Sequence, residues 1–130
     1  MSFLNKLFGK NVPVVRADDS SVPVNSASVA QLDVDVFLAD DSVTIYAHVP
    51  GSSHEDIEIS VEGNSDIIRI EGKRKRPRPQ TKSKRGHFGT EECVWGEFYR
   101  RIILPAPVDI ENADALVEDG LLVLHLPLQE

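Results

Sequence analysis

The chain has 130 residues, of which 41% are hydrophobic, and a formal net charge of −7 at pH 7. This length and apolar content are typical of one domain with a real core, and the acidic balance disfavours a dedicated nucleic-acid binder. Cys93 is the only cysteine, which excludes an internal disulfide and fits a reducing compartment. No apolar run approaches the roughly 20 residues of a membrane-spanning helix. We therefore expect a soluble, cytoplasmic protein.

Residues 1–30 are predicted to form an N-terminal arm. Phe3, Leu4, Leu7 and Phe8 recur at helical spacing, which predicts a short amphipathic helix that needs a surface to dock on. Polar residues interrupt this stretch too early for the apolar core of a signal peptide. Residues 11–30 are rich in Val, Pro, Ser and Asp without a helical period, so we expect an extended, mobile linker.

From residue 31 onward, apolar and polar residues alternate. The alternation predicts strands near 32–36, 43–49, 57–62, 68–71, 94–104, 113–117 and 121–126. Turn residues separate them, as at Asp40-Asp41, Pro50-Gly51, Gly63-Asn64 and Asp119-Gly120. Such strands have one buried and one solvated face. The expected fold is an all-β antiparallel sandwich over residues 31–128, with 129–130 as a residual tail.

A basic segment, Lys73–Arg85, interrupts this pattern and contains eight of the fourteen Lys and Arg residues. Pro77 and Pro79 disfavour regular structure, so we predict a long charged loop that leaves the strand near Ile70. Its charge invites a nucleic-acid interpretation. However, the rest of the chain is strongly acidic, and no aromatic residue within the segment is available for base stacking. A solvated loop that pairs with the acidic body or arm is the favoured interpretation.

Catalytic and cofactor motifs are absent from the sequence, including the P-loop, GxGxxG, HExxH, CxxC and GxSxG. The four histidines lack metal-ligand spacing. Cys93 and His87 form a conceivable nucleophile and base, but no third orienting group accompanies them, which favours an inert thiol. We expect no enzymatic activity, no cofactor and no metal, and a protein that binds other polypeptides.

An ordered series of landmarks runs through the second part of the chain: Val49-Pro50-Gly51, Glu55-Asp56-Ile57, Ile68–Arg74, Gly96–Arg100, Leu104-Pro105, Val108-Asp109, Ala115 and Asp119–Val123. In this order and spacing they resemble the alpha-crystallin domain of small heat-shock proteins, over about residues 31–128. The resemblance implies an immunoglobulin-like β-sandwich and an ATP-independent chaperone, or holdase, that captures unfolding proteins in a stress response.

The length of the basic loop resembles the bacterial and plant branch of that family. The resemblance to this branch implies a swapped homodimer, in which a strand within residues 85–95 crosses to the partner's edge strand near residues 32–38. Arg100 occupies the position of the family's arginine and is expected to pair with an interface carboxylate, with a snorkelling edge arginine as the alternative. Trp95 occupies an aromatic position whose first expected role is packing. The predicted dimer-interface residues are Phe88, Glu92, Trp95 and Arg100.

Members of the family usually carry a tail in which two branched aliphatics, one residue apart, dock in a groove of a neighbouring dimer. Leu126-Pro127-Leu128 lies too close to the last strand for this purpose. The arm contains two triplets with the same pattern of two branched aliphatics separated by one residue, Val12-Pro13-Val14 and Val22-Pro23-Val24. In an extended chain the two valines of each triplet point the same way. Either triplet is a candidate to fill the groove, with simple linker composition as the alternative. The predicted groove residues are Ile57, Ile59, Val61, Ala113, Ala115 and Val117.

Client proteins are expected to bind the apolar arm residues Phe3, Leu4, Leu7 and Phe8, and the groove when it is vacated. The partners are therefore unfolding clients and the chain itself, as a dimer or a larger oligomer, without nucleic acid. Two alternatives remain: an adaptor that serves one partner on the same fold, and membrane-surface association through the arm helix, which is the less favoured of the two.

Overall fold

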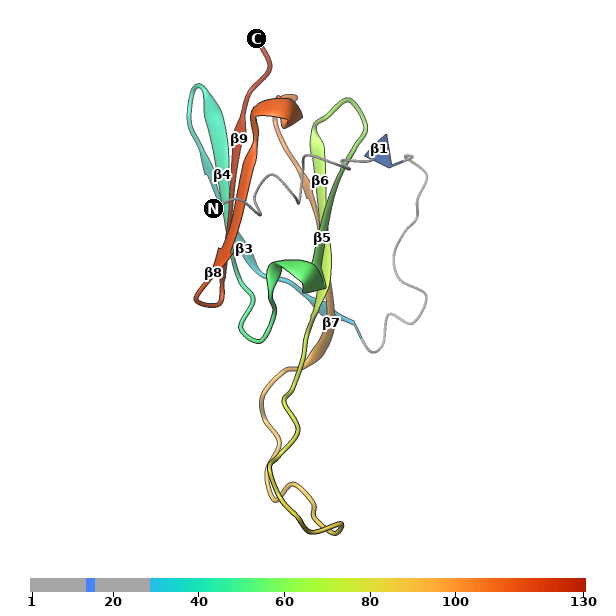
Figure 1. Cartoon of the computed structure of the whole chain (residues 1–130). Helices are drawn as coiled ribbons and strands as arrows, with labels where there is room; N and C mark the ends of the chain where they lie inside the picture. Colours follow the sequence, from blue (N-terminus) through green and yellow to red (C-terminus); the bar gives the residue numbers. More distant parts are fainter. Residues whose placement is uncertain (1–13, 16–28) are drawn as a thin grey trace.

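The computed structural model describes residues 14–15 and 29–130 (Figure 1). The predicted arm helix over Phe3–Phe8, Val12 and the triplet at residues 22–24 lie outside the described residues. The described part contains nine strands and two short 3₁₀ helices. They are β1 Val14–Val15, β2 Ala30–Gln31, β3 Val34–Leu38, β4 Ser42–His48, η2 His54–Asp56, β5 Ile57–Glu62, β6 Ile67–Arg74, β7 Gly96–Ile103, η3 Ile110–Asn112, β8 Asp114–Glu118 and β9 Leu121–Pro127.

The strands form two sheets that face each other (Figure 1). One sheet, called sheet A here, has five strands in the order β1-β5-β6-β7-β2; sheet B has four in the order β3-β4-β9-β8. The two-residue strands β1 and β2 pair in parallel with β5 and β7, and the other pairings are antiparallel. The predicted all-β sandwich is confirmed.

The core lies between the sheets and follows the alternation of the sequence. Ile59 pairs with Ile70 within sheet A, and Ile45 pairs with Leu124 within sheet B; all four side chains are buried. A one-residue slip would turn every apolar side chain of a strand toward solvent, so burial fixes the register. Phe98, which is 1% exposed, is the largest fully buried side chain.

The first predicted strand, near residues 32–36, is divided in the structure. Ala30–Gln31 pairs with β7 in sheet A, whereas Val34–Leu38 pairs with β4 in sheet B. Leu32 lies between the two strands, where the chain passes from one sheet to the other; it is completely buried, and its N–H donates to the carbonyl of Tyr99 in β7 at 3.1 Å. Leu32 is therefore buried and hydrogen-bonded to β7, although it belongs to neither strand.

The basic loop was predicted to begin at Lys73, but β6 continues through Arg74. Lys73 pairs with Glu97 and Arg74 with Gly96 in the β6–β7 ladder. The Lys73 side chain is exposed to solvent, while the Arg74 guanidinium lies 5.0 Å from the centroid of the Phe98 ring. Residues 75–95 then form the predicted long loop, which projects from one end of the sandwich (Figure 1), and β7 begins at Gly96 rather than at Val94.

Candidate functional site

Exposed apolar side chains of the described residues concentrate in two regions. Strand β3 contributes Val36, Phe37 and Leu38, of which Phe37 is 63% exposed, and the long loop contributes Phe88, Val94 and Trp95. Tyr46 and Ile103 are also exposed. Clustered apolar surface on a well-packed domain is typical of a protein-binding site. Strand β3 and the loop therefore form the candidate site.

Strand β3 is the outermost strand of sheet B, and among the described residues it pairs only with β4. An edge strand presents a row of backbone N–H and C=O groups to which another chain can add a strand. Val36 and Leu38 pair with the buried Ile45 and Val43, so they lie on the core-facing side of the sheet and yet remain exposed. This edge offers both backbone and apolar contacts.

The loop is fixed at its root by the turn between β4 and η2. Ser52 Oγ donates to the carbonyl of Lys73 at 2.6 Å, and the Lys75 N–H donates to the carbonyl of Gly51 at 3.2 Å. The Lys75 ammonium also lies 3.0 Å from the carboxylate of Asp56. The Ser53 N–H donates to that carboxylate, and this bond together with Lys75 lowers the pKa of Asp56, although burial opposes the shift.

Arg76 connects the two legs of the loop. Its guanidinium lies 4.1 Å from the ring centroid of Phe88 and 6.0 Å from that of Trp95, and it donates to Glu91 at 3.1 Å. Both aromatic contacts fall within the range of cation–π attraction. Phe88 and Trp95 were predicted at the dimer interface, and the structure brings them together around one arginine that the sequence did not single out.

Arg100 lies on β7 and donates from Nη1 to the carbonyl of Leu32 at 2.9 Å. Its side chain therefore binds the segment in which the chain crosses between the sheets. None of the ion pairs between described residues includes Arg100. Its expected pairing with an interface carboxylate stays a prediction, as does the interface role of exposed Glu92.

A buried ion-pair network on sheet A was missed by sequence reasoning. Glu62 is completely buried, and its two carboxylate oxygens accept from Arg69 at 3.1 Å and from Arg101 at 3.0 Å. Arg69 also pairs with Glu71 at 3.1 Å. Burial acts against the charge of Arg69, but the neighbouring carboxylates of Glu71 and Glu62 raise its pKa. Opposite charges on adjacent strands were visible in the sequence, whereas the burial of Glu62 was not.

The six predicted groove residues lie in or against the core. Ile57, Ile59 and Val61 of β5 and Ala113 and Ala115, at and beside the start of β8, are at most 5% exposed, and Val117 packs against them. The backbone of Val14, the last residue of the first valine triplet, pairs with Val61 at the outer edge of β5. That triplet therefore ends beside the strand predicted to line the groove, and groove filling itself stays a prediction.

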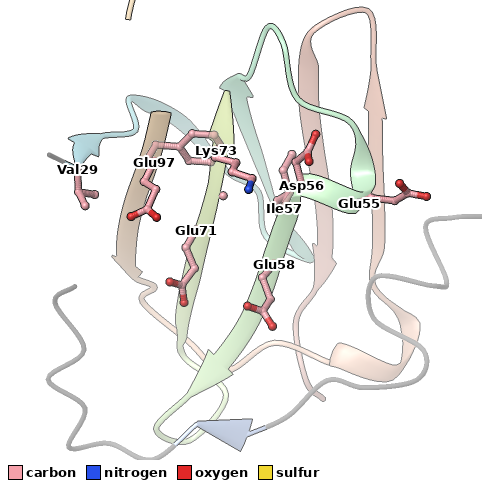
Figure 2. Close-up of a pocket in the computed structure, with 10 residues that line it drawn as sticks. Val29, Glu55, Asp56, Ile57, Glu58, Glu71, Lys73 and Glu97 are labelled. Carbon is pink, nitrogen blue, oxygen red and sulfur yellow. The ribbon is translucent and has the colours of Figure 1, made fainter. Parts of the chain in front are cut away.

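A cavity of about 650 Å³ lies over one end of β5, β6 and β7, and its lining is rich in carboxylates (Figure 2). Glu55, Asp56, Glu58, Glu71 and Glu97 line it, together with Lys73, Val29, Ile57, Gly72 and Phe98.

Within the described residues no cluster of three or more His, Cys, Asp or Glu side chains is suited to hold a metal ion. Cys93 is exposed in the loop, and no described helix is long and apolar enough to cross a membrane.

Comparison with known proteins finds relatives among heat shock proteins of plants and bacteria. The 22.7 kDa class IV heat shock protein of Pisum sativum is 37% identical over 82 residues, which cover 63% of this chain and 40% of that protein. Small heat shock protein C4 of Rickettsia felis is 32% identical over 82 residues, covering 63% and 47%. The chain thus spans about half of the length of these curated relatives.

Solved structures agree with the sequence relatives. Heat shock protein 16.0 from Schizosaccharomyces pombe superposes with a TM-score of 0.62 at 26% identity, over 77% of this chain and 88% of that one. A small heat-shock protein from Xylella fastidiosa, described as having a distinct high order structure, gives 0.61 at 29% identity over 76% and 86%. The fold is that of the alpha-crystallin domain of small heat-shock proteins. The Hsp20/alpha crystallin family model matches residues 35–130, and the chain belongs to this family.

Proposed function

We propose that the chain is an ATP-independent holdase that binds unfolding proteins and limits their aggregation. The observation that carries the proposal is the exposed apolar surface of β3 and the loop on a sandwich of the small heat-shock family. Apolar patches of this kind suit varied unfolded clients, because they require no fixed hydrogen-bond pattern. Client contacts by the arm residues Phe3, Leu4, Leu7 and Phe8 are part of the same proposal, as are a cytoplasmic location and the absence of catalysis.

Light scattering of a heat-labile enzyme tests the holdase. The enzyme is warmed without ATP, alone, with the chain at a few subunits per client, or with an equal mass of an inert globular protein. Suppression by the chain alone is the expected result. Unchanged scattering in its presence would refute the holdase and leave the adaptor as the next hypothesis. Binding to anionic vesicles in a flotation assay would instead support the membrane alternative.

We further propose that the chain assembles as a swapped homodimer. Two observations support this: β3 is an edge strand with exposed Val36, Phe37 and Leu38, and the loop projects away from its own sandwich with Phe88, Val94 and Trp95 exposed (Figure 1). Pairing of the loop of one subunit with β3 of the other would cover both surfaces and remove the open edge. Arg100 and Glu92 are the proposed polar members of this interface.

A charge placed on β3 tests the swapped dimer. Leu38→Lys is expected to reduce dimerisation in analytical ultracentrifugation, since it introduces an ammonium where the partner's loop would pack. Ile103→Lys is the matched control, because Ile103 is 71% exposed on β7, outside the proposed interface. Equal dimerisation of both variants would contradict the swap.

We also propose that Val12-Pro13-Val14 occupies the edge of β5 in assembly of dimers into larger oligomers. Its support is the parallel pairing of Val14 with Val61, which puts the end of the triplet next to the predicted groove. A Val12→Gly/Val14→Gly double variant is expected to lower the oligomer mass measured by light scattering. Val22→Gly/Val24→Gly serves as the comparison that decides between the triplets. An unchanged oligomer mass in both double variants would favour the alternative, in which the two triplets are ordinary linker sequence.

A further inference from the structure

Trp95 is held at the root of the loop by the Pro50–Ser52 turn. A Cβ atom built on Gly51 would lie 3.3 Å from Cζ3 of Trp95 and 3.4 Å from the carbonyl oxygen of Lys75. Gly51 also has a φ of +84°, which glycine adopts without strain. The turn therefore lies directly against both the indole and the backbone of the outgoing leg, and a larger residue would displace them.

The outgoing leg is bound to the same turn. The hydrogen bonds from Ser52 to Lys73 and from Lys75 to Gly51, together with the Lys75–Asp56 ion pair, hold residues 73–75. The returning leg reaches the turn through Trp95. Both legs consequently leave the sandwich from one point with a defined direction.

Beyond this point Arg76 is the residue that joins the legs. It contacts Phe88 and Glu91, which lie 12 and 15 positions further along the chain, and Trp95 at the root. The Arg76 and Glu91 side chains are 36% and 56% exposed, so the contact is open to solvent and contributes little to folding. These four residues, Arg76, Phe88, Glu91 and Trp95, are called the Arg76 cluster.

We propose that Arg76 is a positioning residue for self-association. By holding Phe88 and Trp95 on one guanidinium, it fixes the apolar surface of the loop in the orientation that a second copy of this chain meets with its β3 edge. An ordered loop loses less conformational entropy on binding than a mobile one. This inference rests on the proposed swapped dimer and assigns the orientation of its loop to one side chain.

The test uses the chain of residues 1–130 with three variants, Arg76→Gln, Arg76→Lys and Arg78→Gln. Arg78 is the matched control, because it is an exposed arginine two residues away for which the structure shows no ion pair or ring contact with another described residue. Trp95 is the only tryptophan, so intrinsic fluorescence and its quenching by acrylamide report on the Arg76 cluster directly. Sedimentation equilibrium gives the dimer dissociation constant of each variant.

Arg76→Gln is expected to raise acrylamide quenching of Trp95 and to weaken the dimer by roughly 5- to 30-fold, since each dimer contains two such clusters. Arg76→Lys should recover most of the affinity, because the ammonium retains the charge facing Glu91 and the rings. Arg78→Gln should match the parent chain in both measurements.

A dimeric parent with an equally dimeric Arg76→Gln variant would overturn the inference and leave the swapped dimer standing. A monomeric parent chain would overturn the swapped dimer and the inference together, and the two failures are therefore distinguishable. Unchanged melting temperatures across the variants show that a weakened dimer does not reflect unfolding.

Discussion

The sandwich and the long loop are parts of one molecule organised by different forces. Strands β5, β6 and β7 are held by alternate apolar side chains that are almost fully buried, such as Ile59, Ile70 and Phe98. The loop over residues 75–95 has no strand pairing and depends on a few polar and aromatic contacts at its root. Burial determines whether the domain folds, while the contacts of the loop determine where it points.

A Glu–Arg ion pair occurs in both the sandwich and the loop, and its surroundings differ between them. Glu62 accepts from Arg69 at 3.1 Å in the sandwich, and Glu91 accepts from Arg76 at 3.1 Å in the loop. The Glu62 side chain is 0% exposed and that of Glu91 is 56% exposed. Water screens the second pair, whereas removal of a partner from the first leaves charge in a site shielded from solvent. Equal distances therefore correspond to unequal free energies.

The largest expected contrast is between two phenylalanines. Phe98→Ala removes a ring that is 1% exposed and is expected to lower the free energy of unfolding by about 3–5 kcal/mol. Phe88→Ala, at a loop residue that is 47% exposed, should change it by less than about 0.5 kcal/mol. Urea unfolding followed by circular dichroism measures both. Similar losses of unfolding free energy in the two variants would contradict the difference between sandwich and loop.

The two ion pairs give the next largest contrast. Glu62→Gln leaves Arg69 and Arg101 without their shared carboxylate and is expected to destabilise the fold by about 2–3 kcal/mol. Glu91→Gln should cost less than about 0.5 kcal/mol, since its pair with Arg76 is screened by water. Urea unfolding at neutral pH separates the two. A Glu62→Gln variant as stable as Glu91→Gln would show that burial of the network has no energetic consequence.

Glycine substitutions in the sandwich and in the loop are also expected to differ in their effect on stability. A Cβ atom on Gly72 would lie 2.5 Å from the carbonyl oxygen of Asp56 and 2.8 Å from Cζ of Phe98, so Gly72→Ala is expected to cost about 1–3 kcal/mol. A Cβ atom on Gly86 in the loop meets nothing within 4 Å, and Gly86→Ala should be close to neutral. Thermal unfolding of the two variants provides the measurement. The reverse order of melting temperatures would contradict the packing around Gly72.

The smallest expected effect is the pH dependence from Asp56. Its pKa is lowered in the folded state, so its contribution is fully present above the ordinary value of 3.8 and is lost as the pH falls through the lowered value. Asp56→Asn is expected to destabilise the domain at pH 7 by about 0.5–1 kcal/mol, with the difference disappearing in strong acid. Glu55→Gln, at an exposed neighbour in η2, is the control. A difference that persists unchanged at low pH would show that the effect is not electrostatic.

The sequence was sufficient to predict those parts of the fold in which burial repeats every second residue. In β4, Val43, Ile45 and Ala47 are buried at every second position, and the strand predicted over 43–49 is observed as Ser42–His48. The extension of β6 through Lys73 and Arg74 was not predicted, because charged residues can continue a ladder when their charged ends remain accessible to solvent. The alternation also placed Leu32 in the first strand, whereas Leu32 is buried between β2 and β3, where the chain passes from sheet A to sheet B.

Sequence reasoning named two of the exposed apolar residues of the candidate site, Phe88 and Trp95, and not their arrangement. Phe88 and Trp95 were selected by resemblance, but their common contact with Arg76 joins positions far apart in the sequence and follows from the path of the loop. The burial of Glu62 between two arginines is likewise a tertiary property. Periodicity reports which side of a strand is buried, and it carries no information on such pairs.

The loop is expected to serve association, and the sandwich is expected to fold without it. The most direct measurement replaces residues 78–91 with a short Gly-Ser linker and follows both urea unfolding and sedimentation equilibrium, since a changed loop length alone costs little stability. The expected result is a shortened chain that unfolds at nearly the same urea concentration as the parent and no longer dimerises. A shortened chain that dimerises as tightly as the parent would contradict it.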